Sequence, residues 1–492
     1  MFSRRWVLTA LLAGATSPSW AEAPARSPRP LARPGATGPN AGASSGAVSG
    51  GGAAIAKAAG LGGTVGFVVM ESASGKVLEA MNEHAGLPPA SVAKAMTTIY
   101  ALDRLGPNYR YTTRVMATGP VQNGRLQGDL ILVGSGDPSL DTDGLGDLAA
   151  ALAARGVKEI TGRFLALAGG IPHIDEIDHD QPDHVGYNPA ISGLNLNYNR
   201  VNFEWKRGGN GYALSMDARG KRFIPAVSMA DMRAVSREAP LFTYKRGQNR
   251  DQWTVAQSAL GNGGSRWLPV RHPELYTAEV FATLMRAHGL RLPEVTLING
   301  LPAAMVLVET QSTPLSDIMR KMLKYSTNIT AEVVGLTASG AGSLVQSAGQ
   351  MQAWAAAKHG ISSRFVDHSG LGGGSRISAT EMARAFREAR GGMLPGLLKE
   401  QGIRDVKGKE IKGHPTRVIA KTGTLNFVSS LAGYIQPKSG KELTFTIFSA
   451  DTKRRDGLSM SERESPEGGK QWARRARNMQ AQLVSRWAEA YT

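Results

Sequence analysis

The stretch of sequence that decides the fold is Pro88-Pro89-Ala90-Ser91-Val92-Ala93-Lys94. Apolar residues recur after it at helical spacing as far as Leu105-Gly106, which predicts a helix that Ser91 opens. On such a helix Ser91 and Lys94 share one face, about 4.5 Å apart along the axis, so the amine can reach the hydroxyl. A serine hydroxyl needs a neighbouring base or a favourable field to become a nucleophile, and Lys94 together with the helix N-terminus supplies both. Taken alone, the pair also fits a capping serine followed by a solvated lysine.

A second short motif, Ser326-Thr327-Asn328, lies in a polar break that follows an apolar helical segment. A break between helices can direct side chains into a cleft. In the functional interpretation Ser326 passes a proton to a departing amine, while the Asn328 amide holds the substrate backbone and Lys94. The alternative is a turn whose polar side chains cap the next helix.

A third motif, Lys421-Thr422-Gly423-Thr424, closes the apolar strand Val418-Ile419-Ala420. Gly423 allows another backbone or a ligand to approach closely, and an extended peptide could pair along such a strand. Lys421, Thr422 and Thr424 could bind a terminal carboxylate, and the Thr424 backbone N–H could join that of Ser91 in an oxyanion hole. The alternative is a strand end and a turn. Each motif is weak alone, but each falls on the element that its chemistry requires, and the three occur in one order.

In this order the motifs resemble those of the penicillin-binding D-Ala-D-Ala carboxypeptidase/endopeptidase family, the low-molecular-mass class C penicillin-binding proteins with a long insertion between the first two motifs. The resemblance extends from about residue 64 to 450. Further matching stretches are Gly75-Lys-Val-Leu78, Gly134-Ser-Gly-Asp-Pro-Ser-Leu140, Ser192-Gly-Leu-Asn-Leu-Asn-Tyr-Asn199, Asp367-His-Ser-Gly-Leu371 and Thr424-Leu-Asn-Phe-Val-Ser-Ser-Leu-Ala-Gly-Tyr434.

The resemblance implies an α/β (α+β) fold, in which a β-lactamase/transpeptidase-like domain carries inserted β-rich domains. It implies a serine hydrolase that acts on peptidoglycan stem peptides through an acyl-enzyme at Ser91, uses no cofactor or metal, and is covalently inhibited by β-lactams. It also suggests that Arg376 and Leu425 line a pocket for the side chain that precedes the scissile bond. Whether the enzyme trims terminal D-Ala as a carboxypeptidase, cuts D-Ala-meso-diaminopimelate cross-links as an endopeptidase, or does both stays open, because pocket depth decides it.

Two other functions use the same fold. A β-lactamase shares the three motifs but must hydrolyse its acyl-enzyme rapidly, and no deacylation glutamate motif is apparent. A non-catalytic envelope-binding protein would keep the fold without the reaction, and the presence of every reactive side chain argues against it. From a different class, a metal-dependent hydrolase is suggested by the run His173 to His184, which is rich in His, Asp and Glu. Its spacing does not follow a helical ligand pattern, so a solvated acidic loop is the favoured interpretation.

The chain divides into four parts by composition. Residues 1–21 read as a signal peptide, with Ser3-Arg4-Arg5 before a short apolar run and Ser19-Trp20-Ala21 as a small-x-small cleavage site. The paired arginines fit a twin-arginine signal as well as an ordinary secretory one, and either predicts a periplasmic protein. Residues 22–63, rich in Ala, Gly, Pro and Ser, predict a flexible linker. Residues 64–118 plus 303–492 are assigned to the catalytic domain, and residues 119–302 to the insertion.

Within these parts, the pattern predicts strands over 417–421, 429–435 and 442–449, and helices over 145–154, 276–288 and 378–390. The last helix begins with the capping box Ser378-x-x-Glu381. The segment Gln471 to Tyr491 predicts a long basic amphipathic helix that packs against the domain, with peripheral contact to an anionic membrane as the alternative.

The charge balance is strongly basic, with 57 Lys and Arg against 40 Asp and Glu, a formal net charge of +17. Such a chain attracts polyanions, but no nucleic-acid-binding motif is present, so nucleic acid is not expected as a partner. There is no cysteine, which excludes disulfides, thiol catalysis and cysteine-bound zinc. The sequence makes no prediction of an oligomeric state.

Overall fold

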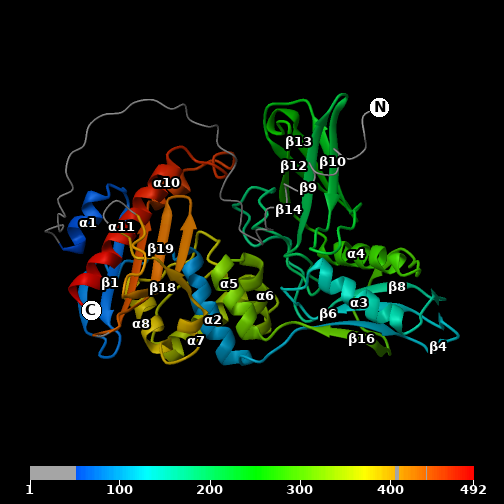
Figure 1. Cartoon of the computed structure of the whole chain (residues 1–492), viewed down its shortest axis with the longest axis horizontal. Coiled ribbons are helices and arrows are strands. Elements are labelled where there is room, and N and C mark those ends of the chain that lie inside the picture. The colour runs from blue at the N-terminus through cyan, green and yellow to red at the C-terminus, as the bar shows by residue number, and fades with distance from the viewer. Residues whose placement is uncertain (1–50, 405–408, 439) are drawn as a thin grey trace, which may run out of the picture. The chain divides into compact units, whose positions relative to one another are not determined.

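The computed structural model describes residues 51–404, 409–438 and 440–492. Its central element is a six-stranded sheet of order β17-β18-β19-β20-β1-β2 (Figure 1). The strands are β1 (Thr64–Glu71), β2 (Val77–Met81), β17 (Lys399–Gln401), β18 (Arg417–Leu425), β19 (Val428–Gln436) and β20 (Leu443–Ala450). Strand β1 pairs antiparallel with β20 along its whole length. The sheet therefore joins an early segment of the chain to a late one.

Both faces of this sheet are covered by helices, and the apolar runs of the strands reflect this. On one face, Phe67 and Val69 of β1 pack with α1 (Gly52–Ala58) and α11 (Gly469–Ala490). Helix α11 runs along the sheet in Figure 1 and buries Trp472 and Trp487 there, so it packs against the domain as the sequence predicts. On the other face, neighbouring strand residues such as Val68 pack with the helical layer. The catalytic-domain helices of this layer are α2 (Ala93–Leu105), α5 (Leu315–Tyr325), α6 (Asn328–Ser339), α7 (Leu344–His359), α8 (Ala379–Ala389) and α9 (Leu394–Leu397).

The insertion has its own core, built on a five-stranded sheet of order β15-β8-β6-β3-β16. Two helices, α3 and α4, pack on it. Two three-stranded sheets, β10-β9-β14 and β11-β13-β12, and a small ladder β4-β5-β7 complete it. The bounds are β3 Thr112–Ala117, β4 Val121–Gln122, β5 Arg125–Leu126, β6 Leu130–Gly134, α3 Thr142–Ala154, β7 Glu159–Ile160, β8 Phe164–Ala168, β9 Arg200–Gly208, β10 Gly211–Asp217, β11 Ala230–Val235, β12 Phe242–Arg246, β13 Asp251–Ala256, β14 Gly263–Pro269, α4 Pro273–Ala287, β15 Val295–Leu297 and β16 Met305–Gln311.

The structure shifts the expected domain boundaries in two places. Strands β3 and β16 pair with each other inside the insertion's sheet, so the insertion spans 112–311 and not 119–302. Glycine-rich turns mark the sequence only after β3, which is why composition placed the boundary late. Residues 52–58, expected to belong to the flexible linker, form α1, because Ile55 and Ala56 pack into the core beside α11. Residues 22–50 of that range and the expected signal peptide lie outside the described residues.

Across the residues that the structure describes, no helix is long and apolar enough to cross a bilayer. The capping box of α8 is present, with the Ser378 side chain and the Glu381 carboxylate each accepting the backbone N–H of the other's residue. This confirms the expected start of that helix.

Candidate functional site

Ser91 lies in a short 3₁₀ turn, η1 (Ala90–Val92), that runs directly into α2. Its neighbour Ala90 has a φ of 45°, a left-handed conformation that costs a non-glycine residue roughly 1–3 kcal/mol and persists only where the surroundings enforce it. Two glycines close on this turn. A Cβ on Gly370 would overlap the Ala90 carbonyl, and one on Gly423 would lie 2.9 Å from the Ser91 backbone nitrogen. Strand β18 and the loop that holds Gly370 therefore contact the Ser91 turn backbone to backbone.

The Lys94 side chain lies beside Ser91 and is fully buried. Its Nζ lies 3.0 Å from Ser91 Oγ, 2.8 Å from Asn328 Oδ1 and 2.7 Å from the Ser369 carbonyl oxygen. The amide and carbonyl oxygens only accept, so a neutral amine would donate to these two and direct its lone pair at the Ser91 hydroxyl. Burial lowers the pKa of Lys94 to about 8, which makes the neutral form accessible near physiological pH.

Two carboxylates lie beneath Lys94, and both are buried. Glu332 accepts the backbone N–H of His368 and of Ser369 at 2.9 and 2.8 Å. Asp367 accepts the backbone N–H of Gly370 and of Gly372, each at 2.6 Å. Burial raises the pKa of both carboxyls. Their negative charges raise the pKa of Lys94 and so offset part of the decrease that burial causes. Glu332 was missed by sequence reasoning, because its burial depends on a loop that is distant in the sequence.

The second and third motifs meet at Ser326. This residue ends α5 in a left-handed conformation, φ 60°, and its hydroxyl accepts from Lys421 Nζ at 2.9 Å. Lys421 is also buried, and burial together with the nearby Lys94 charge lowers its pKa well below the usual lysine value. Asn328 begins α6, where its Oδ1 contacts Lys94. The structure thus brings Ser91, Lys94, Ser326, Asn328 and Lys421 together, as the sequence predicts.

The insertion also contributes to this site. The Asn328 Nδ2 donates to the backbone carbonyl of Tyr187 at 3.0 Å, so one amide side chain joins Lys94 to the insertion. Tyr187 lies just after the acidic run His173 to His184, and nothing in its own sequence marks it as part of the site.

Strand β18 offers a free edge beside Ser91. Its inner neighbour β19 pairs with the whole strand, but β17 pairs only with Val418, Ile419 and Ala420. From Lys421 to Leu425 the outer edge has no strand partner within the described residues. Thr422 and Thr424 are exposed there. An extended peptide can add to such an edge by main-chain hydrogen bonds.

The two residues expected to line a side-chain pocket, Arg376 and Leu425, differ in their contacts with the site. Leu425 ends β18, partly buried against the helical layer. The Arg376 guanidinium donates to the carbonyls of Gly373 and Ser375 in its own loop, and no hydrogen bond or ion pair of the described structure links it to the three motifs. The residue type and sequence position of Arg376 alone do not reveal the direction in which its side chain points.

The acidic run His173 to His184 forms ion pairs and one short network. His173 lies between Glu274 and Asp175, and Asp175 also contacts Arg246. His179 contacts Glu176, and His184 contacts Glu464. In the described part of the chain, no group of three or more His, Cys, Asp or Glu side chains is arranged to hold a metal ion.

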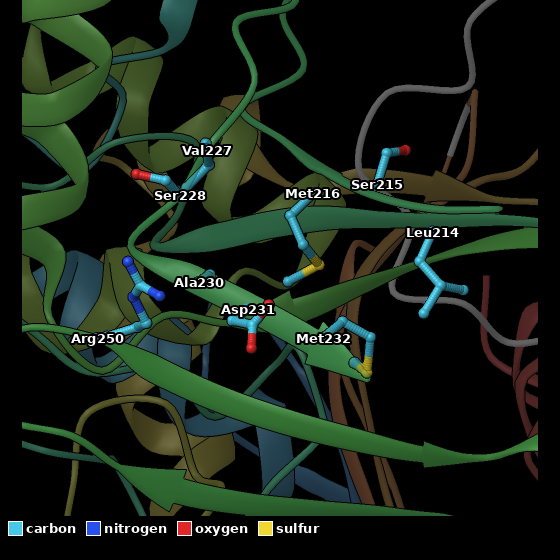
Figure 2. A pocket seen from close by; sticks show the side chains of 9 residues that line it. All are labelled: Leu214, Ser215, Met216, Val227, Ser228, Ala230, Asp231, Met232 and Arg250. Atoms are coloured by element: carbon cyan, nitrogen blue, oxygen red, sulfur yellow. The ribbon is translucent and has the colours of Figure 1, made fainter. Parts of the chain in front are cut away.

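A separate pocket of about 280 Å³ lies in the insertion between β10 and β11 (Figure 2). In Figure 2 the side chains of Met216 and Met232 lie on neighbouring strands, while Ser228 and Arg250 lie toward the other end. Its lining includes no residue of the three motifs, so it is not part of the Ser91 site.

Comparison with known proteins agrees with this geometry. A family model described as the D-Ala-D-Ala carboxypeptidase 3 (S13) family matches residues 53–475. The chain is similar to a D-alanyl-D-alanine carboxypeptidase of Actinomadura sp., with 27% identity over 433 residues, covering 78% of this chain and 77% of that protein. It is also similar to the D-alanyl-D-alanine carboxypeptidase DacB of Haemophilus influenzae, with 26% identity over 416 residues, covering 79% and 85%. The crystal structure of penicillin binding protein 4 (dacB) from Haemophilus influenzae superposes with a TM-score of 0.70 at 20% identity, covering 89% of this chain and 99% of that chain. This likeness confirms the expected fold class.

Proposed function

This chain belongs to the D-Ala-D-Ala carboxypeptidase 3 (S13) family, and from that premise we propose that Ser91 forms an acyl-enzyme with D-Ala-D-Ala-type bonds of peptidoglycan stem peptides. The family and the enzyme class, a serine carboxypeptidase, are those that the three sequence motifs predict.

In the acylation step the neutral Lys94 amine takes the proton of Ser91, whose oxygen attacks the carbonyl carbon of the scissile bond. The negative charge that develops on the carbonyl oxygen meets the backbone N–H groups of Ser91 and Thr424. As the C–N bond breaks, the Ser326 hydroxyl passes a proton to the departing amine and regains one from Lys421, whose Nζ donates to it. Water then hydrolyses the Ser91 ester and releases the shortened peptide.

The observation that carries this proposal is the hydrogen-bonding position of Lys94. It contacts Ser91 while its other two partners, Asn328 and Ser369, are acceptors that hold it in place. A solvated lysine on a capped helix would be exposed, whereas Lys94 is fully buried. Burial disfavours the ammonium form and therefore favours a base.

The free edge of β18 supplies the substrate site. A stem peptide pairs with the segment from Lys421 to Leu425, with its terminal carboxylate against the Lys421 side chain and the exposed Thr422 and Thr424 hydroxyls. This places the last peptide bond beside Ser91, because a Cβ on Gly423 would lie 2.9 Å from the Ser91 nitrogen.

The test is hydrolysis of a D-Ala-D-Ala-terminated pentapeptide and of a purified cross-linked peptide dimer. The wild type is expected to cleave at least one of them, and the ratio separates terminal trimming from cross-link cutting. Ser91→Ala is expected to lower the rate at least about a thousandfold. Ser74→Ala is the matched control, since that exposed serine contacts only its own turn, and it should keep the wild-type rate. Equal hydrolysis by Ser91→Ala and wild type would contradict the proposal.

β-Lactams are proposed to acylate the same serine, and the resulting acyl-enzyme is proposed to hydrolyse slowly. Penicillin binding protein 4 of Haemophilus influenzae has been solved in complex with a β-lactam. In this chain the carboxylates nearest Lys94, Glu332 and Asp367, face backbone N–H groups of a loop. No carboxylate among the described residues is hydrogen bonded to Ser91, Lys94 or Ser326. Without one to activate water, a penicilloyl adduct should persist for minutes or longer, and release within seconds would favour the β-lactamase alternative.

The site of action is proposed to be the periplasm. The support is the signal-like segment 1–21 together with a substrate found in the cell wall. Cell fractionation and N-terminal sequencing test this, with a mature chain expected to begin at Glu22. A cytoplasmic chain that begins at Met1 would contradict it.

A further inference from the structure

The loop Asp367–Gly372 runs between two helices beside the Ser91 site. On one side, Thr97 of α2 donates its hydroxyl to the His368 carbonyl at 2.7 Å. On the other side, Gly335 of α6 lies so close to the His368 ring that a Cβ there would overlap it. The loop is therefore held at a defined position by backbone and ring contacts on both sides.

One residue of this loop is held through both of its backbone polar groups. The N–H of Ser369 donates to Glu332 Oε1 at 2.8 Å, and its carbonyl accepts from Lys94 Nζ at 2.7 Å. The second Glu332 oxygen accepts from the N–H of His368 at 2.9 Å. Glu332 is fully buried and lies one helical turn after Asn328, which contacts the same amine directly.

We propose that Glu332 is a positioning residue for Lys94: it fixes the Ser369 carbonyl that accepts from the amine, and its buried carboxylate supplies the negative charge that the amine faces. The inference rests on the proposed function, in which Lys94 takes the proton of Ser91.

The hydrogen bonds of Glu332 and its burial act on its charge in opposite directions. Both of its oxygens accept N–H groups, which favours the carboxylate, while burial and the Asp367 charge raise the pKa of Glu332 to about 8, so the carboxylate is present in the pH range where Lys94 titrates. Asp367 accepts two N–H groups in the same way. His368 is neutral, because burial lowers its pKa to about 3. The buried groups around Lys94 are thus two carboxylates, a neutral imidazole and the second lysine, Lys421.

The sign of the effect follows from these charges. Burial lowers the pKa of Lys94 to about 8, and the Glu332 charge, more than that of Asp367, opposes this shift. Replacing Glu332 by an uncharged residue removes the opposing charge, so the Lys94 pKa should fall further. Because the neutral amine is the base, the pH at which acylation reaches half its maximum should fall as well.

The experiment measures the second-order rate of acylation by a fluorescent penicillin between about pH 5.5 and about pH 10, a range that brackets the titration of the amine. For Glu332→Gln we expect the midpoint of the rise to move down by about one pH unit, since removal of a neighbouring opposite charge shifts a pKa by about 1–3 units. We also expect the plateau to fall about tenfold, because the amide can accept only one of the two N–H groups and the Ser369 carbonyl loosens.

Glu381→Gln is the matched control. Its carboxylate also accepts two backbone N–H groups, that of Ser378 in the α8 cap and that of Ser362 in the loop after α7, and neither residue contacts Lys94. This variant is expected to melt at a lower temperature while keeping the wild-type midpoint and plateau. A purely structural role for Glu332 would give the same pattern, and a wild-type midpoint in Glu332→Gln would therefore overturn the proposal.

Glu332→Asp keeps the test decisive if the glutamine variant does not fold. It retains the charge on a shorter side chain, so we expect an unchanged midpoint and a reduced plateau. A wild-type plateau would show that the Ser369 carbonyl needs no such support and would overturn the proposal. A wild-type protein that penicillin does not acylate would overturn the proposed function itself, so the two failures are distinguishable.

Discussion

Two groups of ionisable side chains in this chain differ both in sequence and in structure. The run His173 to His184 is dense in His, Asp and Glu, and its members form partly exposed ion pairs, as Asp175 does with His173 and Arg246. The lysines and carboxylates near Ser91 come from four distant stretches, and Lys94, Lys421, Glu332 and Asp367 are all buried. Density of charge along the sequence is thus a poor guide to chemistry. When ionisable side chains converge and are buried, their pKa values shift, and such a shift is what allows Lys94 to act as a base.

The largest effect is expected when the buried base is removed. Lys94→Met keeps the volume of the side chain but cannot accept the Ser91 proton, and it leaves Asn328 Oδ1 and the Ser369 carbonyl without this donor. We expect acylation by penicillin to fall at least about a thousandfold. Stopped-flow or gel-based labelling measures it, and circular dichroism checks that the variant folds. Acylation within about tenfold of the wild type would place the base elsewhere.

The pH dependence of the wild type should be the next largest effect. The Lys94 pKa is lowered to about 8, so the neutral amine becomes rarer by about tenfold for each pH unit below that value. The acylation rate should therefore rise about fiftyfold from about pH 6 to about pH 8 and level off about one unit higher. A rate that is flat over this range would mean that the amine does not titrate there.

A smaller effect is expected from crowding the Ser91 turn. In Gly423→Ala the new Cβ would lie 2.9 Å from both the Pro89 carbonyl oxygen and the Ser91 nitrogen, closer than such contacts allow. Strand β18 must then move by a few tenths of an ångström, which we expect to slow acylation about tenfold. Gly349→Ala is the control, since a Cβ there has no heavy atom within 4 Å and its helix should gain slightly in stability. Equal rates for both variants would show that the close approach is unimportant.

The smallest effect is expected at a partner of the acidic run. Glu464 contacts His184 and Arg266, and these two neighbours lower its pKa to about 2. Glu464→Gln should lower the free energy of unfolding by about 1 kcal/mol at neutral pH and change acylation less than about twofold. Because the folded pKa is depressed, this stability difference should fade as the pH drops from the unfolded value of about 4.5 toward about 2. EDTA should leave hydrolysis unchanged, and a loss of activity would revive the metal hypothesis.

Local patterns predicted much of the catalytic domain. The helix after Ser91, the edge strand that ends in Lys421 to Thr424 and the Ser378 capping box depend on nearest neighbours in sequence, so they could be placed. The apolar strands of the central sheet were recognisable because both faces are buried. The five polar residues that meet at Ser91 were predicted from their order and their elements.

The parts that were not predicted depend on contacts between distant segments. An acidic residue in the middle of α6 looks solvated until the loop at 367–372 covers it, so Glu332 was missed. Helix α1 has an Ala- and Gly-rich sequence typical of a linker, and only the packing of Ile55 beside α11 makes it a helix. The direction of the Arg376 side chain is set by carbonyls of its own loop, which residue type alone does not reveal.

The most direct test of Ser91 as the nucleophile is the mass of the intact protein after incubation with penicillin, followed by peptide mapping. We predict the addition of one penicillin molecule per chain, located on the peptide that holds Ser91 and absent from Ser91→Ala. An adduct on another residue, or the same adduct in Ser91→Ala, would contradict this assignment.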